Sequence, residues 1–277
     1  MKNRSFIFTA VVASLLYVSC TKPQTTLSEN ERPFNPPIMG WSSWNAFLVD
    51  ISEDIIKHQA DLMVEKGLKD AGYQYINVDD GYFGKRDENG VMQANEKRFP
   101  NGMKPVADHI HSLGMKAGLY TDAGTRTCGS LWNKDSIGIG AGIYGHEPQD
   151  AQLYFGDWGF DFIKIDYCGG EVLGLDEKER YTSIRNSIDK VNKNVSINIC
   201  RWAYPGTWAK DAATSWRISG DINAHWNSLK YVVGKNLYLS AYAGNGHYND
   251  MDMMVVGFRN NSRVGGNGLT PTEEEAH

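Results

Sequence analysis

The stretch Phe162-Ile163-Lys164-Ile165-Asp166 decides the fold, because it combines a buried strand with polar chemistry at its carboxyl end. Lys164 and Asp166 are two residues apart, so on an extended strand both side chains point to the same side. A cation and a carboxylate at the end of an apolar strand cost free energy unless they bind or react with something. The stretch therefore predicts a strand that presents Asp166 as a candidate nucleophile, with a structural ion pair as the alternative.

Short apolar strands of the same kind recur along the chain, with amphipathic helical stretches between them. The predicted strands are 38–41, 75–78, 116–120, 162–165, 195–199, 215–218 and 253–256. The predicted helices are 52–66, where Ser52 is the capping residue, 103–113 and 178–191. Regular alternation of this kind predicts a mostly parallel sheet, either a closed barrel or a doubly wound layer.

Polar residues at the ends of many strands distinguish these two folds. They are Trp44, Asp79, Asp80, Asp122, Asp166, Arg201, Asp221, Asp250 and Asp252. Site residues from many strand ends are typical of an α/β (β/α)8 TIM barrel, whereas a doubly wound sheet concentrates its site at one switch point. The sequence therefore predicts a barrel. Only seven strands can be counted, and Thr270 or Thr272 followed by glutamates indicates a helix start, so we expect an incomplete, C-terminally truncated barrel.

The first residues predict export. Lys2 and Arg4 precede an apolar run at 6–18, which is too short to span a bilayer and is typical of a signal peptide. The run ends at Val18-Ser19-Cys20, which resembles the end of a bacterial lipobox. We expect a signal peptide over 1–20, with Cys20 lipidated and attached to a membrane or, as the alternative, ordinary cleavage and secretion. Residues 21–35 predict a linker and 36–277 a catalytic domain.

Composition limits the partners and the redox chemistry. A formal net charge of −5 and an isoelectric point near 5.8 argue against nucleic acid. Export permits disulfides, and with Cys20 set aside, Cys128, Cys168 and Cys200 allow one bridge and leave one thiol. The sequence has no Gly-x-Ser-x-Gly elbow, Walker loop or His-Glu-x-x-His pair, so we expect neither a cofactor nor a metal.

Several carboxylates indicate carbohydrate chemistry. Asp79 and Asp80 are neighbours at a strand end, where they suit sugar hydroxyl groups or a cation, with a solvated loop pair as the alternative. Asp221 ends another strand and is a natural partner for Asp166, because retaining glycoside hydrolysis uses one carboxylate as nucleophile and a second as acid and base. Asp250 and Asp252 alternate with methionines, which predicts that both acids share one face of the seventh strand.

These residues, in this order, resemble the melibiase-type α-galactosidase family of glycoside hydrolases, from about residue 36 to the end. The resemblance is carried by Met39-Gly40-Trp41 with Trp44, Asp79-Asp80, Gly118-Leu119-Tyr120 with Asp122, Lys164-Ile165-Asp166, Trp216-Arg217 with Asp221, Asn249-Asp250 and Asp252-Met253. It implies a retaining α-galactosidase without cofactor, with Asp166 as nucleophile and Asp221 as acid/base. It places Trp44, Asp79, Asp80, Tyr120, Lys164, Arg217 and Asp252 around a terminal galactose. It also implies a bridge between Cys128 and Cys168. The family's second bridge would need a partner for Cys200, and because the matching region is Ala212-Ala213-Thr214-Ser215, we expect that bridge to be absent. The family also has an eighth strand and a C-terminal β-sandwich, which we expect to be missing from this sequence.

Arg201 departs from the family pattern. The family carries a glutamate after the fifth-strand cysteine to bind the sugar 2-hydroxyl, and this chain has Cys200-Arg201-Trp202. Arginine only donates hydrogen bonds, so Arg201 either donates to that hydroxyl or pairs with a carboxylate. This leaves a β-L-arabinopyranosidase and an α-N-acetylgalactosaminidase as alternatives. A non-catalytic carbohydrate-binding protein is the alternative of a different class, and a metal-dependent hydrolase is a third.

Overall fold

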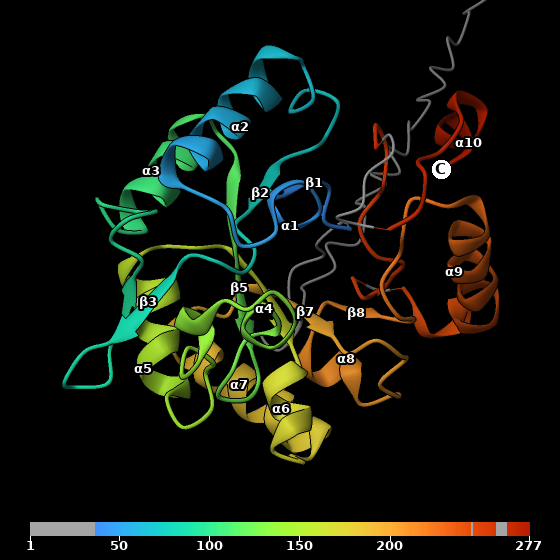
Figure 1. Ribbon diagram of the computed structural model, residues 1–277. Coiled ribbons are helices and arrows are strands. Elements are labelled where there is room, and N and C mark those ends of the chain that lie inside the picture. The colour runs from blue at the N-terminus through green and yellow to red at the C-terminus, as the bar shows by residue number, and fades with distance from the viewer. Residues whose placement is uncertain (1–36, 245, 259–264) are drawn as a thin grey trace, which may run out of the picture. The chain divides into compact units, whose positions relative to one another are not determined.

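A computed structural model describes residues 37–244, 246–258 and 265–277, all within one unit that extends from Arg32 to His277. Its centre is a seven-stranded parallel sheet in the order β1-β2-β5-β6-β7-β8-β9. The strands are β1 (Gly40–Ser42), β2 (Tyr75–Asn77), β5 (Lys116–Asp122), β6 (Phe162–Asp166), β7 (Ser196–Cys200), β8 (Ser215–Arg217) and β9 (Tyr248–Asp250). Each new strand joins the same growing edge, and the sheet curls into part of a barrel (Figure 1). The predicted incomplete α/β barrel is confirmed.

Helices and one hairpin fill the connections. The helices are α1 (Trp44–Phe47), α2 (Glu53–Glu65), α3 (Lys104–Ser112), α4 (Cys128–Trp132), α5 (Glu147–Ala151), α6 (Cys168–Val172), α7 (Glu177–Val191), α8 (Ala209–Ala212), α9 (Trp226–Leu239) and α10 (Pro271–Ala276). The short turns of helix are η1 (Ser136–Gly138), η2 (Gln152–Asp157) and η3 (Ser240–Tyr242). The hairpin of β3 (Phe83–Arg86) and β4 (Met92–Ala94) was not predicted. None of the described helices is both long enough and apolar enough to cross a membrane.

Capping residues set the helix boundaries as the sequence predicts. The Ser52 hydroxyl accepts a hydrogen bond from the Ile55 amide at 3.3 Å, which starts α2 at Glu53. Thr270, rather than Thr272, caps α10, because its side chain and that of Glu273 bond each other's backbone amides in a capping box. The other two predicted helices are α3, which is one residue shorter than predicted at each end, and α7, which begins one residue earlier than predicted.

The period of two along the strands separates the core from the site. On β6, Ile163 and Ile165 are fully buried in the apolar cluster beneath the helices, whereas Lys164 and Asp166 face the inside of the curled sheet. α2 packs against β2 and α3, and α3 also packs against β5. Burial of one face by helices fixes the register of each strand, and thereby the direction of each polar side chain.

The predicted seventh strand at 253–256 is wrong. The strand of the structure is β9, which ends at Asp250, and Asp252 has a φ of 76°, which interrupts the extended backbone. The apolar run after it serves a different purpose: Val255 is fully buried in a second, smaller cluster with Ile222 and Leu229. Asp250 and Asp252 therefore do not share one strand face.

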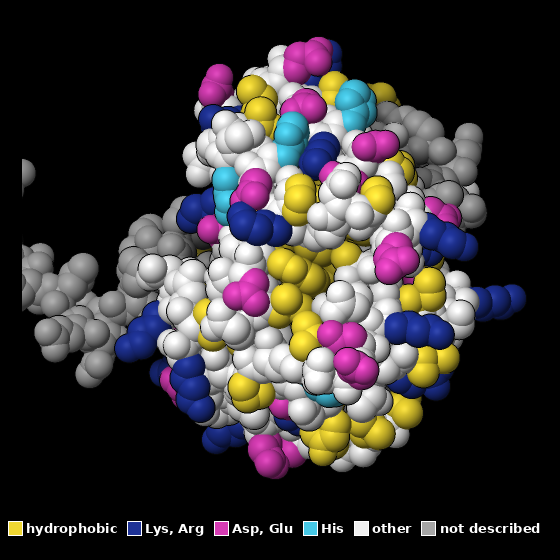
Figure 2. Space-filling model, turned by 90° about the vertical axis from the view of Figure 1, so that its left-hand side faces the viewer, with side chains coloured by type: hydrophobic (Ala, Val, Ile, Leu, Met, Phe, Trp, Pro, Cys, Tyr) yellow, Lys and Arg dark blue, Asp and Glu magenta, His cyan; other side chains and the backbone are white. Residues whose placement is uncertain are grey.

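The surface carries mixed charges on the face that Figure 2 shows, where acidic and basic side chains of the described residues are interspersed. The exposed apolar side chains include several on α9, among them Tyr231, Leu237 and Tyr238. Leu229, on the same helix, is buried in the second apolar cluster.

Candidate active site

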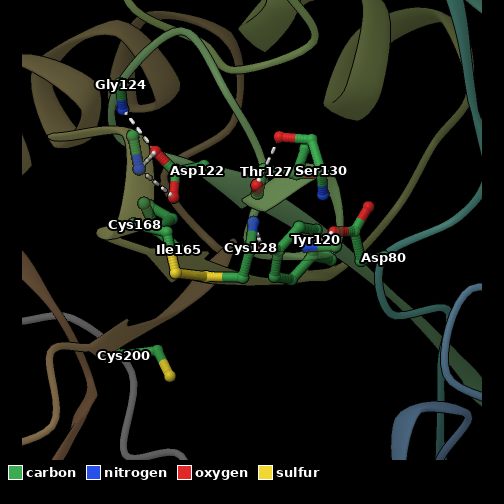
Figure 3. Close-up of a disulfide and its surroundings, with 12 residues drawn as sticks. Asp80, Tyr120, Asp122, Gly124, Thr127, Cys128, Ser130, Ile165, Cys168 and Cys200 are labelled. Carbon is green, nitrogen blue, oxygen red and sulfur yellow. Dashed lines mark hydrogen bonds between the residues drawn. A yellow bond between two sulfur atoms is a disulfide. The ribbon is translucent and has the colours of Figure 1, made fainter. Parts of the chain in front are cut away.

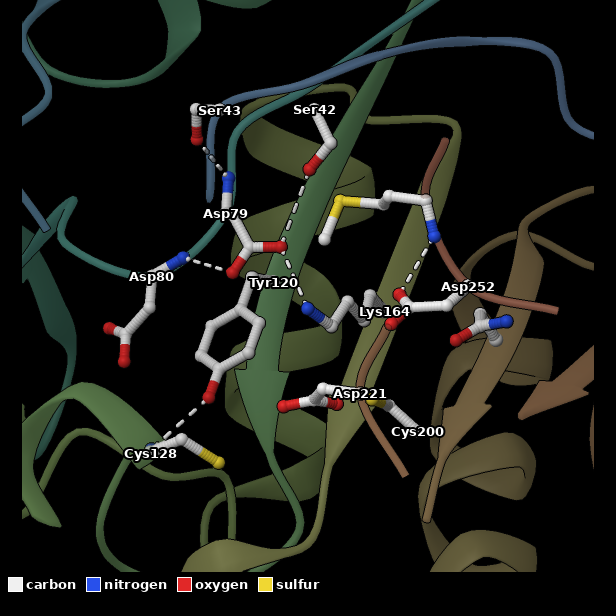
Figure 4. A network of polar contacts seen from close by, with 12 residues as sticks. Ser42, Ser43, Asp79, Asp80, Tyr120, Cys128, Lys164, Cys200, Asp221 and Asp252 are labelled. Atoms are coloured by element: carbon white, nitrogen blue, oxygen red, sulfur yellow. Dashed lines mark hydrogen bonds and ion pairs between the residues drawn. The ribbon is translucent and has the colours of Figure 1, made fainter. Parts of the chain in front are cut away.

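A cavity of about 470 Å³ lies at the carboxyl ends of the strands, which is within the range of about 300–1,000 Å³ typical of small-molecule sites. Eight of the ten residues predicted to be catalytic or substrate-binding line it: Trp44, Asp79, Tyr120, Lys164, Asp166, Arg217, Asp221 and Asp252. Figure 4 shows how side chains from separate strands converge there. The parallel sheet brings all its strand ends to one edge, so residues as far apart in the sequence as Trp44 and Asp252 share one wall.

The floor of this cavity, defined by Asp79, Lys164 and Asp166, is buried. The Lys164 ammonium lies 2.9 Å from Asp79 Oδ2, and the Asp79 side chain is only 3% exposed. Burial alone lowers the pKa of Lys164, but the surrounding negative groups, Asp79 first, together raise the pKa well above its usual value. Ser43 fixes the backbone beside this pair by accepting a hydrogen bond from the Asp79 amide at 3.0 Å. The floor therefore holds a permanent cation beside Asp166.

Asp166 has the properties of a reactive carboxylate. It is 6% exposed, and its Oδ1 atom is buried without a hydrogen-bond partner among the described residues. Burial raises the pKa of Asp166 to about 6, while Lys164 opposes this shift and so does a hydrogen bond from Cys200. An unpartnered carboxylate oxygen in a cavity wall is typical of a site that binds or reacts.

The mouth of the cavity, defined by Asp221, Trp132 and Asn223, is open to solvent. The Asp221 side chain is 70% exposed, and its Oδ1 atom lies 3.1 Å from the guanidinium of Arg217. The same Nη2 atom of Arg217 lies 3.1 Å from Asp252 Oδ2, which also accepts a hydrogen bond from the Ile222 amide at 2.8 Å. Arg217 therefore positions two acids from two different chain segments.

A disulfide between Cys128 and Cys168 joins α4 to α6 beside the cavity, as the family resemblance implies (Figure 3). The Tyr120 hydroxyl accepts a hydrogen bond from the Cys128 amide at 3.2 Å. Asp122 lies near both sulfur atoms, but sulfur in a disulfide is not available as a thiolate ligand, so the group does not form a metal site. Cys200 is a buried free thiol, and burial raises its pKa well above the usual value, so it remains protonated beside Asp166.

Two of the predicted substrate-binding residues lie outside the cavity wall. Asp80 is fully buried behind it, where its oxygens accept hydrogen bonds from the amides of Gly81 and Gly129, each at 2.8 Å. Burial raises the pKa of Asp80 to about 7. Arg201 pairs with Glu177 at 2.6 Å, which is the second of the two arrangements that its sequence position predicts. Neither residue is among those that line the cavity.

Sequence reasoning did not assign seven residues of the wall to the site: Asn45, Trp132, Asn133, Trp202, Ile222, Asn223 and Met253. Trp132 and Asn133 lie more than ten positions after the end of the preceding predicted strand, so no strand period indicates them. Asn223 lies two residues after Asp221, so its position near a predicted strand end could have indicated that it belongs to the site. Among the described residues the wall also contains Cys128, Cys168 and Cys200, so all three of these cysteines border the site.

The fold and the site define a class of protein: an α/β barrel with strand-end carboxylates around a sugar-sized cavity. The profile of the family described as Alpha galactosidase A matches residues 36–264. An alpha-galactosidase A from Cellvibrio japonicus is 38% identical over 290 residues, which cover 100% of this chain and 66% of the relative. An alpha-galactosidase from Cyamopsis tetragonoloba is 40% identical and is covered over 57% of its length by 91% of this chain.

Solved structures give the same result. The structure of an alpha-galactosidase from Saccharomyces cerevisiae with raffinose has a TM-score of 0.72 and 30% identity, over 87% of this chain and 55% of that one. The chain therefore belongs to the alpha-galactosidase A family. It spans 66% and 57% of the lengths of the two curated relatives named above.

Proposed function

We propose that this chain carries the active site of a retaining α-galactosidase, which hydrolyses terminal α-D-galactosyl residues of oligosaccharides or polysaccharides. One observation carries the proposal: a buried carboxylate beside a cation, Asp166 with Lys164, shares a cavity with an exposed carboxylate, Asp221. Two carboxylates in opposite environments suit a nucleophile and an acid/base. Similarity to alpha-galactosidases at 38–40% identity supports the substrate class.

In this mechanism the ionised Asp166 attacks the anomeric carbon, while Asp221 donates its proton to the departing glycosidic oxygen. The bond from carbon to the leaving oxygen breaks as the bond to the Asp166 carboxylate forms. Asp221, now ionised, then removes a proton from water, and the resulting hydroxide displaces Asp166 from the sugar. Two displacements at one carbon retain its configuration. Lys164 favours the ionised form of Asp166 in both the free enzyme and the product state.

The remaining wall residues suit a galactose ring. Asp79 and Asp252 present carboxylate oxygens to sugar hydroxyl groups, and Trp44 and Tyr120 present aromatic surfaces. Raffinose ends in an α-galactosyl unit, and the related alpha-galactosidase from Saccharomyces cerevisiae has been solved with it. We extend that substrate class to this chain. Asp80 then acts behind the wall, through the Gly129 amide that it holds, rather than on the sugar.

The test is hydrolysis of an aryl α-galactoside by this chain, with the first-formed sugar followed by proton NMR. We expect α-galactose to appear first and Asp166→Asn to abolish turnover while leaving the circular dichroism spectrum unchanged. Retained turnover in that variant would exclude Asp166 as the nucleophile, and β-galactose as the first product would exclude retention. Aryl β-L-arabinopyranoside and α-N-acetylgalactosaminide, assayed in parallel, test the two alternative specificities, and calorimetric binding of galactose without hydrolysis would indicate a non-catalytic protein.

We further propose that the chain is exported and that Cys20 is lipidated, so that a lipid attaches it to a membrane. The residues concerned lie outside the described part of the structure, so the support is the sequence pattern of 1–20 and the disulfide, which suits an oxidising compartment. Metabolic labelling with a radioactive fatty acid tests this proposal. We expect label on the wild-type chain and none on Cys20→Ser; equal labelling of both would exclude lipidation at this residue.

A further inference from the structure

We propose that Trp132 is the stacking platform for the sugar that leaves, so that the site recognises the pyranose ring linked to the terminal galactose. This inference rests on the proposed hydrolysis and adds a binding position beyond the galactose itself. It assigns the mouth of the cavity to a carbohydrate leaving group. It predicts that this chain favours α-galactosyl oligosaccharides over galactosyl compounds with a small leaving group.

The exposure of Trp132 is the first observation. Its side chain lines the cavity, yet the residue is 76% exposed. A single exposed apolar side chain on a protein surface is ordinary. An indole that stands free at the opening of a polar cavity, however, offers a flat apolar surface at the place where a ligand enters or extends.

The order of burial along the cavity gives the direction in which the substrate lies. Asp166 is 6% exposed at the floor, and the Asp221 side chain is 70% exposed at the mouth. The nucleophile and the acid act on opposite sides of the bond that breaks, and the acid must contact the leaving oxygen. The leaving group therefore lies on the solvent side of the galactose, on the same side as Trp132.

The helix that carries Trp132 is anchored, although the indole itself is exposed. Trp132 ends α4, and the first residues of this helix are joined to residues that lie on or just after three strands of the sheet. The Cys128 amide donates to the Tyr120 hydroxyl on β5, the disulfide joins Cys128 to Cys168 after β6, and the Gly129 amide donates to Asp80 after β2 at 2.8 Å. An anchored backbone limits the conformational entropy that this segment loses when the ligand arrives.

Gly129 shows how closely α4 is seated. A Cβ atom at this position would lie 2.6 Å from Asp80 Oδ2 and 2.8 Å from a Val49 side-chain carbon, so only glycine allows the contact with Asp80. Thr127 adds a cap, because its hydroxyl accepts a hydrogen bond from the Ser130 amide at 3.2 Å. The buried Asp80, which does not line the cavity, thus positions the helix that carries Trp132.

The chemistry of the surroundings identifies the ligand as a pyranose. One face of a pyranose ring presents carbon-bound hydrogens that pack on an aromatic ring, and its edges present hydroxyl groups. Asn133 and Asn223 lie in the same cavity wall, and a side-chain amide both donates and accepts hydrogen bonds. An aromatic platform beside two amides matches a neutral sugar, whereas an anionic ligand would require cations at the mouth.

The experiment compares two substrates with the same galactose and different leaving groups. α-Galactosyl fluoride has a leaving group too small to reach Trp132, and raffinose has a glucose ring in that place. We expect Trp132→Ala to lower kcat/KM for raffinose about tenfold and to change kcat/KM for the fluoride less than twofold. Trp132→Phe should recover most of the raffinose activity, because it keeps an aromatic surface. Tyr238→Ala, which removes an 87% exposed aromatic side chain from α9, should affect neither substrate.

The outcomes separate this inference from the proposed hydrolysis. Equal losses on both substrates would overturn the platform role and assign Trp132 to the structure of the site. No loss on either would overturn it as well. If wild-type protein hydrolyses neither substrate, the proposed function fails, and calorimetry on Asp166→Asn then decides the inference. Raffinose should bind about tenfold more tightly than galactose, and Trp132→Ala should remove that difference; equal binding of both sugars before the substitution would overturn the platform.

Discussion

The floor and the mouth of the cavity are built in opposite ways. Of the floor residues, Lys164 and Asp166 lie on β6, whose register is fixed by a buried apolar face, and Asp79 lies two residues after the end of β2. The Asp79 and Asp166 side chains are buried, and that of Lys164 is 19% exposed. The mouth residues Asp221 and Trp132 stand on segments that follow strands, and both are mostly exposed. The same carboxyl group thus occurs in two surroundings, and this difference is the basis on which we propose the two roles that retaining hydrolysis requires.

The largest effect on turnover should come from substituting the two carboxylates and comparing substrates with different leaving groups. Asp166→Asn should lower turnover at least ~10⁴-fold on every substrate, because no other group forms the covalent bond. Asp221→Asn should lower kcat about 10²–10⁴-fold on raffinose, whose leaving group needs a proton. On 2,4-dinitrophenyl α-galactoside, whose leaving group departs unprotonated, Asp221→Asn should retain most of its first-step rate. Stopped-flow release of the phenolate measures that step.

Free azide serves as the control for this pair. It should accelerate turnover of the dinitrophenyl substrate by Asp221→Asn and yield α-galactosyl azide, because the intermediate on Asp166 no longer has a base for water. An exchange of behaviours between the two variants would reverse the assignment of floor and mouth.

The next largest effect should be on the free energy of unfolding, and only substitutions at the floor should change it. Lys164→Met leaves the Asp79 carboxylate buried beside no cation, which costs about 3–5 kcal/mol in the free energy of unfolding. Asp221→Asn removes a mostly exposed carboxylate, and we expect a change within about 0.5 kcal/mol. Urea denaturation followed by tryptophan fluorescence measures both. The double variant Lys164→Met/Asp79→Asn is the matched control, because it removes both charges and should recover part of the loss.

The pH dependence should report the floor as well. The pKa of Asp166 is raised to about 6, so kcat/KM for α-galactosyl fluoride should fall about tenfold per pH unit below pH 6 as Asp166 takes up a proton. Fluoride needs no proton donor to leave, so Asp221→Asn should keep this acidic limb. An acidic limb that disappears in Asp221→Asn would mean that the mouth, rather than the floor, titrates there.

The same pKa shift has a definite sign for stability. Because the folded pKa of Asp166 lies above the usual value of 3.8, the folded protein binds more protons than the unfolded chain between these values. The contribution of Asp166 to the free energy of unfolding is therefore fully present below pH 3.8 and is lost as the pH rises through about 6. Asp80 and Asp122, whose pKa values are raised to about 7 by burial, act in the same direction up to that pH.

The smallest effect should come from Arg201, which the sequence places in the site and the structure pairs with Glu177 outside the cavity wall. Both side chains are partly exposed, so Arg201→Ala should cost at most about 1 kcal/mol of stability. The ratio of kcat/KM for α-galactoside to that for α-N-acetylgalactosaminide should change less than twofold. A tenfold change in that ratio would indicate that Arg201 contacts the substituent at the sugar 2-position.

The floor of the site could be predicted from the sequence, and the mouth could not. Strand period and parallel pairing place Lys164 and Asp166 at one edge of the sheet, and they do the same for Asp79 and Arg217, so residue spacing is sufficient there. Trp132 depends on where α4 is attached to other strands, which no local pattern records. The error at 253–256 has a similar cause: an apolar run can fill a small cluster, as Val255 does, without pairing in a sheet.

The Cys128–Cys168 bridge has a consequence for the unfolded chain as well as for the site. It links positions 40 residues apart, and closing a loop of that length removes conformational entropy from the unfolded ensemble that is worth about 4 kcal/mol in the chain-entropy account. That amount is comparable to the whole stability margin of many domains. The segment enclosed by this loop contains Lys164 and Asp166, so the bridge restricts the unfolded conformations of the segment that carries two of the floor residues. In a reducing compartment this contribution to stability would be absent.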